Sequence, residues 1–290
     1  MILLTGATGF TGRFVCDVLL DRGLPFRCLV RDPAKASSLV DRAVPCVSGD
    51  VRDENSIRRA LEGCSGVINL VEFNQGHVAL LLREAARANV RRALFVSATA
   101  IFTRLDAPSK AMRERTEAEI ARSGLDWTVL RPTMIYGARG DRNMERLAAA
   151  LSRFPVHPIL GTGDRLLQPI HVRDLARAVV DAYVSENTAG CAFNLSGKSA
   201  LTYRESVREV ARLLEKRIWM FSLPTGMAIL AAEVSRRIPG LPKISREQVE
   251  RLNEDKAFRH EKASEAWGFD PMDFSTGIRM ELEDLGLLGR

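Results

Sequence analysis

The sequence predicts an α/β fold with a doubly wound parallel sheet, and two observations lead to this. Short apolar runs alternate with segments of helical periodicity through the first half of the 290 residues, and a glycine-rich turn directly follows the first apolar run. A chain that passes repeatedly from strand to helix returns to the same sheet, so its strands lie parallel and its helices cover both faces. The rhythm changes after Gly137, which predicts a smaller C-terminal substrate lobe.

Six strands and five helices are expected in the first part. The strands are expected at residues 2–6, 26–31, 44–50, 66–71, 91–98 and 126–132. The helices are expected at residues 10–23, 33–41, 53–62, 77–90 and 113–122. We divide the chain into a nucleotide-type domain of residues 1–151 and a mixed lobe of residues 152–290. Within the lobe, CAFNLSG at residues 191–197 is a candidate to return to the main sheet, and Thr202 and Glu205 are spaced as a capping box.

Composition argues against several classes of protein. The formal charge is +6, but the arginines are spread over the whole chain and only 6% of residues are aromatic, so we expect no nucleic-acid partner. The five cysteines form no CxxC pair, which predicts reduced thiols in a cytoplasm and no metal site. No apolar run reaches the ~20 residues of a membrane span. Residues 223–234, LPTGMAILAAEV, are expected to form a buried or amphipathic helix, with a membrane-surface role as the alternative.

The turn GATGFTG carries Gly6, Gly9 and Gly12 between the first strand and the first helix. One glycine allows a tight turn, another lets backbone N–H groups approach a pyrophosphate, and the third lets the helix pack against the strand. The helix N-terminus then directs its free N–H groups at the phosphates. In this context the motif predicts a dinucleotide site in a Rossmann fold. The alternative is a glycine-rich turn without a ligand.

Further motifs cover nearly the whole chain. They are Gly49–Asp50 with Val51 after the third strand, GVINLV at 66–71, LRPTMIYG at 130–137 and QPIHVRDLARAV at 168–179. Together with the glycine turn, they resemble the short-chain dehydrogenase/reductase superfamily in its extended and atypical branches, which include NAD-dependent epimerase/dehydratase-like proteins. The chain is also similar to the nucleotide-binding accessory subunit of respiratory NADH dehydrogenase.

The resemblance implies a set of cofactor contacts at the ends of the strands. They are Gly6, Thr8, Gly9, Phe10, Thr11, Gly12, Arg31, Asp50, Val51, Asn69, Leu70, Val71, Ser97, Arg113 and Pro132. After the second strand, an acidic residue would hold the ribose of NAD, whereas an arginine would pair with the 2′-phosphate of NADP. Because Arg31 precedes Asp32, and Arg13 adds a second positive charge, we favour NADP(H) over NAD(H). The alternative is that Asp32 takes the ribose.

The usual catalytic pair of this superfamily is Tyr-x-x-x-Lys, because residues i and i+4 share a helix face. Alignment back from GLDWTVLRP places Ser109 at the tyrosine and Arg113 at the lysine, and Ala98 at the strand-five serine. The catalytic residues therefore stay unknown. Tyr136 could donate a proton from another direction, although we prefer a packing role for it. His171 fits a hydrogen-bonded structural residue, and His77, His157 and His260 have no recognisable partner.

Two functions remain open from the sequence. The first is an NADP(H)-dependent oxidoreductase or nucleotide-sugar epimerase-like enzyme with a non-standard proton donor, acting on a small-molecule substrate. The second is a non-catalytic NADP(H)-binding redox sensor or assembly subunit, which Ser109 and Arg113 favour. A homodimer or another protein partner is compatible with either function. Epimerisation depends most strongly on the missing tyrosine.

Overall fold

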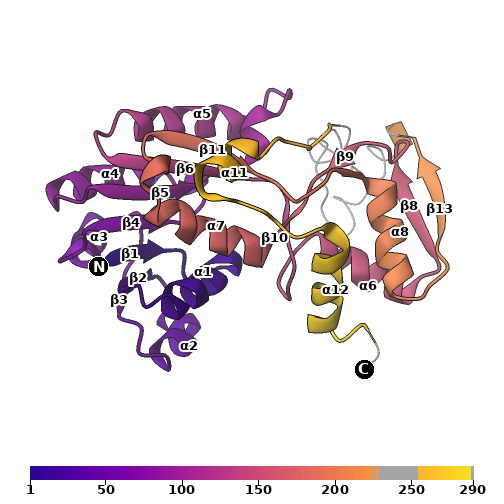
Figure 1. Cartoon of the computed structure of the whole chain (residues 1–290), viewed down its shortest axis with the longest axis horizontal. Coiled ribbons are helices and arrows are strands. Elements are labelled where there is room, and N and C mark those ends of the chain that lie inside the picture. Colours follow the sequence, from indigo (N-terminus) through magenta and orange to yellow (C-terminus); the bar gives the residue numbers. More distant parts are fainter. Residues whose placement is uncertain (225, 228–253, 289–290) are drawn as a thin grey trace.

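A computed structural model describes residues 1–224, 226–227 and 254–288 of the chain (Figure 1). Its main sheet has seven parallel strands in the order β11-β6-β5-β4-β1-β2-β3. These strands are β1 (Ile2–Thr5), β2 (Phe26–Val30), β3 (Cys46–Ser48), β4 (Gly66–Asn69), β5 (Arg92–Val96), β6 (Asp126–Pro132) and β11 (Cys191–Leu195). The predicted Rossmann-like α/β fold is confirmed, and the strand order reverses between β1 and β4.

Helices cover both faces of this sheet. One face carries α1 (Phe10–Asp21), α2 (Ser37–Val40) and α7 (Val172–Val184), and the other carries α3 (Glu54–Leu61), α4 (Val78–Arg87) and α5 (Pro108–Ala121). Side chains alternate along each strand, so Leu4 packs in the core beneath α1 while its neighbour Leu3 packs in the core beneath α4. Strands buried on both faces read as continuous apolar runs, which is why their sequences show no polar alternation.

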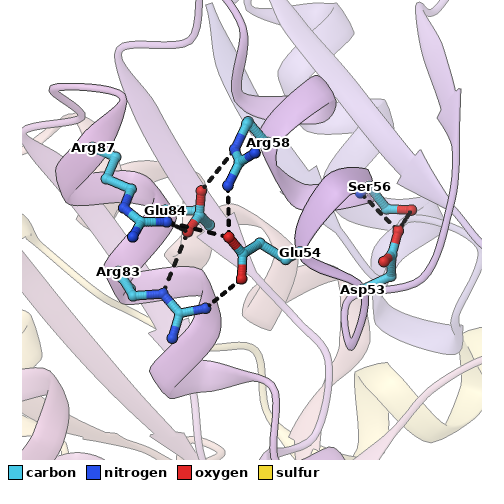
Figure 2. Close-up of polar contacts among 7 residues, drawn as sticks. All are labelled: Asp53, Glu54, Ser56, Arg58, Arg83, Glu84 and Arg87. Atoms are coloured by element: carbon cyan, nitrogen blue, oxygen red, sulfur yellow. Dashed lines mark hydrogen bonds and ion pairs between the residues drawn. The ribbon is translucent and has the colours of Figure 1, made fainter.

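An ionic network joins α3 to α4, two of the three helices on the same face of the sheet (Figure 2). The Glu84 side chain is 1% exposed and lies within 2.6 Å of the Arg87 guanidinium and 3.3 Å of that of Arg58. Glu54 bridges Arg58 at 2.6 Å and Arg83 at 2.7 Å. A buried carboxylate is costly without partners, so the three arginines are what allow Glu84 to sit at this helix contact.

The second half of the chain forms a smaller lobe with its own apolar core. That core is built by α6 (Met144–Arg153), α8 (Tyr203–Leu213) and α12 (Phe274–Asp284). The Thr202–Glu205 capping box at the start of α8 is confirmed. The remaining elements are η1 (Pro33–Ala36), η2 (Phe73–Gln75), η3 (Thr99–Phe102), η4 (Glu186–Thr188), β7 (Ile135–Tyr136), β8 (Val156–Leu160), β9 (Leu166–Leu167), β10 (Ile170–His171), β12 (Leu201–Thr202), β13 (Trp219–Leu223) and α11 (Glu261–Trp267).

The lobe and the main sheet are interleaved along the chain. Strand β11 pairs with β6, so CAFNLSG does return to the main sheet, and α7 packs against α1. The boundary at residue 151 stays a prediction.

Most of the apolar segment 223–234 lies outside the described residues. Within the described ranges, no helix combines the length and apolar character needed to span a bilayer, and no cluster of side chains suits a metal ion.

Candidate dinucleotide site

The residues predicted for the cofactor gather at one edge of the sheet. Gly6 follows β1, Arg31 follows β2, Asp50 follows β3, Leu70 follows β4 and Ser97 follows β5. Because all these strands are parallel, their carboxyl ends meet at that edge. The strand order reverses between β1 and β4, beside Gly6 and Leu70, and α/β sheets bind ligands at such switch points.

The glycine turn leaves little room for side chains, least of all at Gly12. Gly6 has φ +78°, and a Cβ there would lie 3.2 Å from the Leu70 Cβ. A Cβ at Gly12 would lie 2.1 Å from the Gly6 carbonyl oxygen. Gly9 caps α1 without a side-chain hydrogen bond, and the first turn holds no acidic residue. The N–H groups of that turn are therefore available to an anion, as a dinucleotide pyrophosphate requires.

Arg31 and Asp32 differ sharply in their surroundings. The Asp32 carboxylate caps η1 by accepting from the Ala34 N–H at 3.1 Å, and lies 3.9 Å from the Lys35 ammonium. Arg31 is exposed and makes no hydrogen bond or ion pair with another described residue, although its positive charge also acts on the Asp50 carboxylate. The acidic side chain is thus already engaged, whereas the guanidinium beside it is available to a phosphate.

The second predicted cation, Arg13, is held against the protein. Its guanidinium lies over the rings of Phe10 and Phe14, at 5.4 and 5.0 Å from the ring centres, and donates to the Arg139 carbonyl oxygen. This links the start of α1 to the loop after β7. Arg13 therefore has a structural role that its position in the sequence does not reveal.

Asp50 is fixed by Arg52 two residues later. The Arg52 guanidinium donates to both carboxylate oxygens, at 3.0 and 2.8 Å, and its backbone N–H donates at 2.9 Å. These hydrogen bonds lower the pKa of Asp50 to about 2, so the side chain is an acceptor at any physiological pH. The neighbouring Val51 is half-buried.

A buried polar network lies behind the glycine turn. The Asn69 side-chain oxygen accepts from the Thr5 hydroxyl at 2.7 Å and contacts the His77 Nε2 at 2.9 Å, while the Asn69 amide donates to the Val71 carbonyl at 3.0 Å. Burial lowers the pKa of His77 to about 4, so the ring is neutral. The network fixes the ends of β1 and β4, where Gly6 and Leu70 meet.

Two other histidines also have partners that the sequence did not suggest. His157 contacts the Tyr203 hydroxyl at 3.0 Å, and His260 contacts the Ser196 hydroxyl at 2.7 Å. With His77, all three histidines described as having no recognisable partner are therefore bonded. The error arose because each partner except Asn69 lies more than 40 positions away in the chain.

Helix α5 holds Ser109 and Arg113, the residues aligned from the sequence with the usual tyrosine and lysine, on one face. The Ser109 hydroxyl is buried and has no hydrogen-bond partner among the described residues. Arg113 donates to the Ser109 carbonyl oxygen at 2.9 Å. A buried hydroxyl without a partner is costly unless a ligand or water satisfies it. Ser109 thus has the environment of a residue that meets a bound group.

One turn further along the same face, Glu117 clamps α5 to the sheet. Its carboxylate accepts from the Ser97 hydroxyl at 2.7 Å and from the Arg131 guanidinium at 3.0 and 2.5 Å. Glu117 is 8% exposed, so this is a buried ion pair. Sequence reasoning missed it. The available signal was the spacing of 109, 113 and 117, which share a helix face.

The remaining hydroxyl at the end of β5 is also engaged. Thr99 donates to the Pro132 carbonyl oxygen at 3.2 Å, and Ala98, at the expected catalytic position, has no polar side chain.

Tyr136 is 1% exposed and packs on His171 and Phe274, with ring centres 5.4 Å apart in both pairs. Burial raises the pKa of Tyr136 well above its usual value, which makes it a poor proton source.

His171 acts as a cap. Its Nδ1 accepts from the Arg173 N–H at 3.2 Å at the start of α7, and burial lowers its pKa to about 4. Both Tyr136 and His171 therefore lie in the packed junction between the main sheet and the smaller lobe. This geometry favours the packing role over an acid–base role for each of them.

Comparison with known proteins agrees with this geometry. Residues 6–158 match the model of a family described as NAD(P)H-binding. The chain belongs to this family. It is 30% identical over 210 residues to the NAD(P)H azoreductase of Xenophilus azovorans, with 71% of each chain covered. The resemblance inferred from the sequence motifs, including that to the accessory subunit, is confirmed.

The chain is also similar to a respiratory-chain subunit in sequence and to a solved quinone oxidoreductase in fold. The mitochondrial NADH dehydrogenase (ubiquinone) 1 alpha subcomplex subunit 9 of Arabidopsis thaliana is 26% identical over 220 residues, which cover 69% of this chain and 54% of that protein. The NADPH-dependent quinone oxidoreductase of Escherichia coli, solved with NADPH, superposes with a TM-score of 0.79 at 22% identity. The superposition covers 96% of this chain and 98% of that one, and shows a shared fold.

Proposed function

We propose that this protein is an NADPH-dependent oxidoreductase that passes hydride to a small conjugated acceptor, such as a quinone or an azo compound. The observation that carries the proposal is the face of α5, which holds the Arg113 guanidinium and a buried Ser109 hydroxyl that has no hydrogen-bond partner in the described part of the chain. On this proposal, these residues stand in place of the usual lysine and tyrosine. The azoreductase and quinone oxidoreductase to which the chain is similar support this choice of acceptor.

The chemistry follows from which groups are present. A reduced nicotinamide supplies a hydride when it is bound at this site. Arg113 does not release its proton near neutral pH, but its cation stabilises negative charge on a reduced acceptor or holds a ribose hydroxyl. A conjugated acceptor spreads the incoming electron pair over several atoms and takes its proton from water. Epimerisation instead requires a base to deprotonate a sugar hydroxyl, and neither Ser109 nor Arg113 offers one.

The preference for NADPH rests on Arg31 and Asp32. The Asp32 carboxylate caps η1. It is therefore poorly placed to accept hydrogen bonds from both hydroxyls of an adenosine ribose. Arg31 is exposed at the end of β2, where a 2′-phosphate would lie in a protein of this fold. The other proposed contacts are those of the glycine turn, Asp50, Val51, the segment 69–71, Ser97, Arg113 and Pro132.

The test is calorimetric titration with NADPH and with NADH. Loss of a charged pair with the 2′-phosphate predicts that Arg31→Ala weakens NADPH binding by about tenfold or more while leaving NADH binding nearly unchanged. Asp32→Ala is the matched control, expected to change NADPH affinity little. If Asp32→Ala abolishes NADH binding and Arg31→Ala is silent, the preference is for NAD.

Turnover is tested separately, by following NADPH oxidation with a water-soluble quinone and an azo dye. Non-catalytic binding of NADPH is the second candidate. The Ser97 and Thr99 hydroxyls, which follow β5 where a substrate oxygen would be oriented, both donate to other groups of the protein instead. Tight NADPH binding with no oxidation by either acceptor would favour that function. Turnover that falls on Arg113→Ala but survives Arg115→Ala, a change at an exposed neighbour on the same helix, would favour the enzyme.

A further inference from the structure

An exposed apolar cluster of two aromatic residues and a valine lies at the end of the smaller lobe, away from the dinucleotide site. It consists of Phe154, Val156 and Trp219, whose exposed fractions are 61%, 42% and 67%. These are among the most exposed large apolar side chains of the described residues. A cluster of this kind on a folded protein usually marks a contact surface.

The pairing of two strands explains why these residues meet. Strands β8 and β13 form a separate parallel sheet in which Trp219 pairs with Val156, and the Trp219 N–H donates to the Pro155 carbonyl oxygen at 2.8 Å. Since the strands are parallel, both begin at the same end of the sheet. The ring of Trp219 is stacked on that of Phe221, with centres 5.7 Å apart.

Positive charge gathers at the same end. Arg153 directly precedes Phe154, and Lys216 and Arg217 come just before β13, and all three are exposed. Lys216 also donates to the Ser152 carbonyl oxygen, which ties the two strand starts together. Residues 152–163 and 216–224 contain no aspartate or glutamate; Asp164 and Glu215 flank these ranges. The cluster is therefore apolar and aromatic with a cationic border.

We propose that this end of the lobe docks on a bilayer surface rich in anionic phospholipids. Tryptophan favours the boundary between headgroups and acyl chains because one side of its ring is apolar and the other carries an N–H donor. Arginine and lysine at the border would face the phosphates. The inference does not depend on the proposed catalytic function, since it uses other residues.

The shape of this end favours a bilayer over an acidic protein. Figure 1 shows β8 and β13 on the side of α6 and α8 that faces away from the seven-stranded sheet. The narrow two-stranded sheet therefore lies at an end of the molecule, and Phe154, Val156 and Trp219 are exposed at or beside the start of its strands. Energetically dominant residues of protein interfaces instead cluster in packed, water-excluding pockets. A projecting aromatic end can enter the interface of a bilayer without such a pocket.

Vesicle flotation tests the proposal with the full-length protein. We expect binding to phosphatidylcholine vesicles that contain phosphatidylglycerol, weaker binding to phosphatidylcholine alone, and loss of binding in high salt. Trp219→Ala should weaken binding by about tenfold or more, because it removes the largest apolar group. Val184→Ala is the control, as Val184 is 50% exposed on α7. Arg153→Gln with Arg217→Gln should abolish the preference for anionic vesicles.

Trp219 also supplies a direct signal. Anionic vesicles should shift the tryptophan emission of the wild type to shorter wavelength, and Trp219→Phe should lose this shift. The proposal is overturned if anionic vesicles do not bind, or if Trp219→Ala binds as well as Val184→Ala. It is equally overturned if Trp219→Ala only converts a dimer to a monomer in solution, since the cluster would then contact a second copy of the chain.

Discussion

At the scale of single residues, Gly12 allows the sharpest prediction. A Cβ there would lie 2.1 Å from the Gly6 carbonyl oxygen and 2.6 Å from that of Ala7, and both are backbone atoms that cannot rotate away. We expect Gly12→Ala to lower the free energy of unfolding by about 1–3 kcal/mol, as overpacking does, and to impair NADPH binding by displacing α1 from β1. Denaturant titration and calorimetry measure the two effects.

Gly23→Ala is the control for this substitution. Gly23 has φ +62° but nothing within 4 Å of an added Cβ, so the change brings backbone strain without a clash. It should cost stability without affecting the cofactor. If Gly12→Ala binds NADPH as the wild type does, the close approach of helix to strand has no role in the site.

Some single-residue features could be foreseen and others could not. The positions of the glycine turn, Arg31 and Asp50 after strands could be foreseen, because each lies within a short motif that follows an apolar run, and their contacts with a cofactor stay a prediction. Glu117 was missed because its partners Ser97 and Arg131 lie 20 and 14 positions away, and only the folded sheet brings them together. Asp32 could be identified as the alternative ribose contact, but not as the cap of η1.

At the scale of elements, α12 is packed through a buried carboxyl group. Glu281 is 0% exposed, and burial raises its pKa from 4.5 to about 9, with Asp141 acting in the same direction. Asp141 accepts from the N–H groups of Asn143 and Met144 at the start of α6, and Glu145 lies nearby. In the folded protein Glu281 is thus neutral, and it is buried on α12 where that helix shares an apolar core with α6.

This contact should make stability depend on pH. The folded pKa of Glu281 lies above the unfolded value, so its favourable contribution is complete below about pH 4.5 and is lost as the pH rises toward about 9. Glu281→Gln removes the ionisation and should raise the free energy of unfolding at pH 8 by several kcal/mol, on the order of 4, but little at pH 5. Denaturant titration at both pH values measures this. An equal effect at the two values would contradict it.

The strands of the main sheet followed the sequence where a short apolar run was bounded by turn residues. The expected positions of β1, β2, β4 and β6 agree with the structure to within two residues at either end. Helix α5 begins at Pro108 rather than 113, because its early turns carry few apolar residues and gave no periodic signal. Strand β13 was not foreseen, since its face is exposed and its pairing with β8 depends on a segment about 60 positions earlier.

At the scale of the whole molecule, the two halves of the chain share the main sheet. Strand β11 adds to the edge at β6, and α7 packs its buried Leu175 and Val179 in the core beneath α1. The Arg92 guanidinium reaches across to the Ala182 and Tyr183 carbonyl oxygens, at 2.6 and 3.0 Å. Chain order predicts a domain ending at residue 151, and that boundary stays a prediction, but elements from both sides of it pack on one sheet.

A fragment of residues 1–151 should therefore fail to fold on its own. Removing β11 and α7 would expose the edge of β6 and the apolar side of α1, and would leave the half-buried Arg92 without its carbonyl partners. We expect the fragment to show no cooperative unfolding transition and no NADPH binding, whereas the full chain shows both. A fragment that unfolds cooperatively and binds NADPH would establish residues 1–151 as an independent domain, with α7 and β11 as additions to a sheet that is already stable.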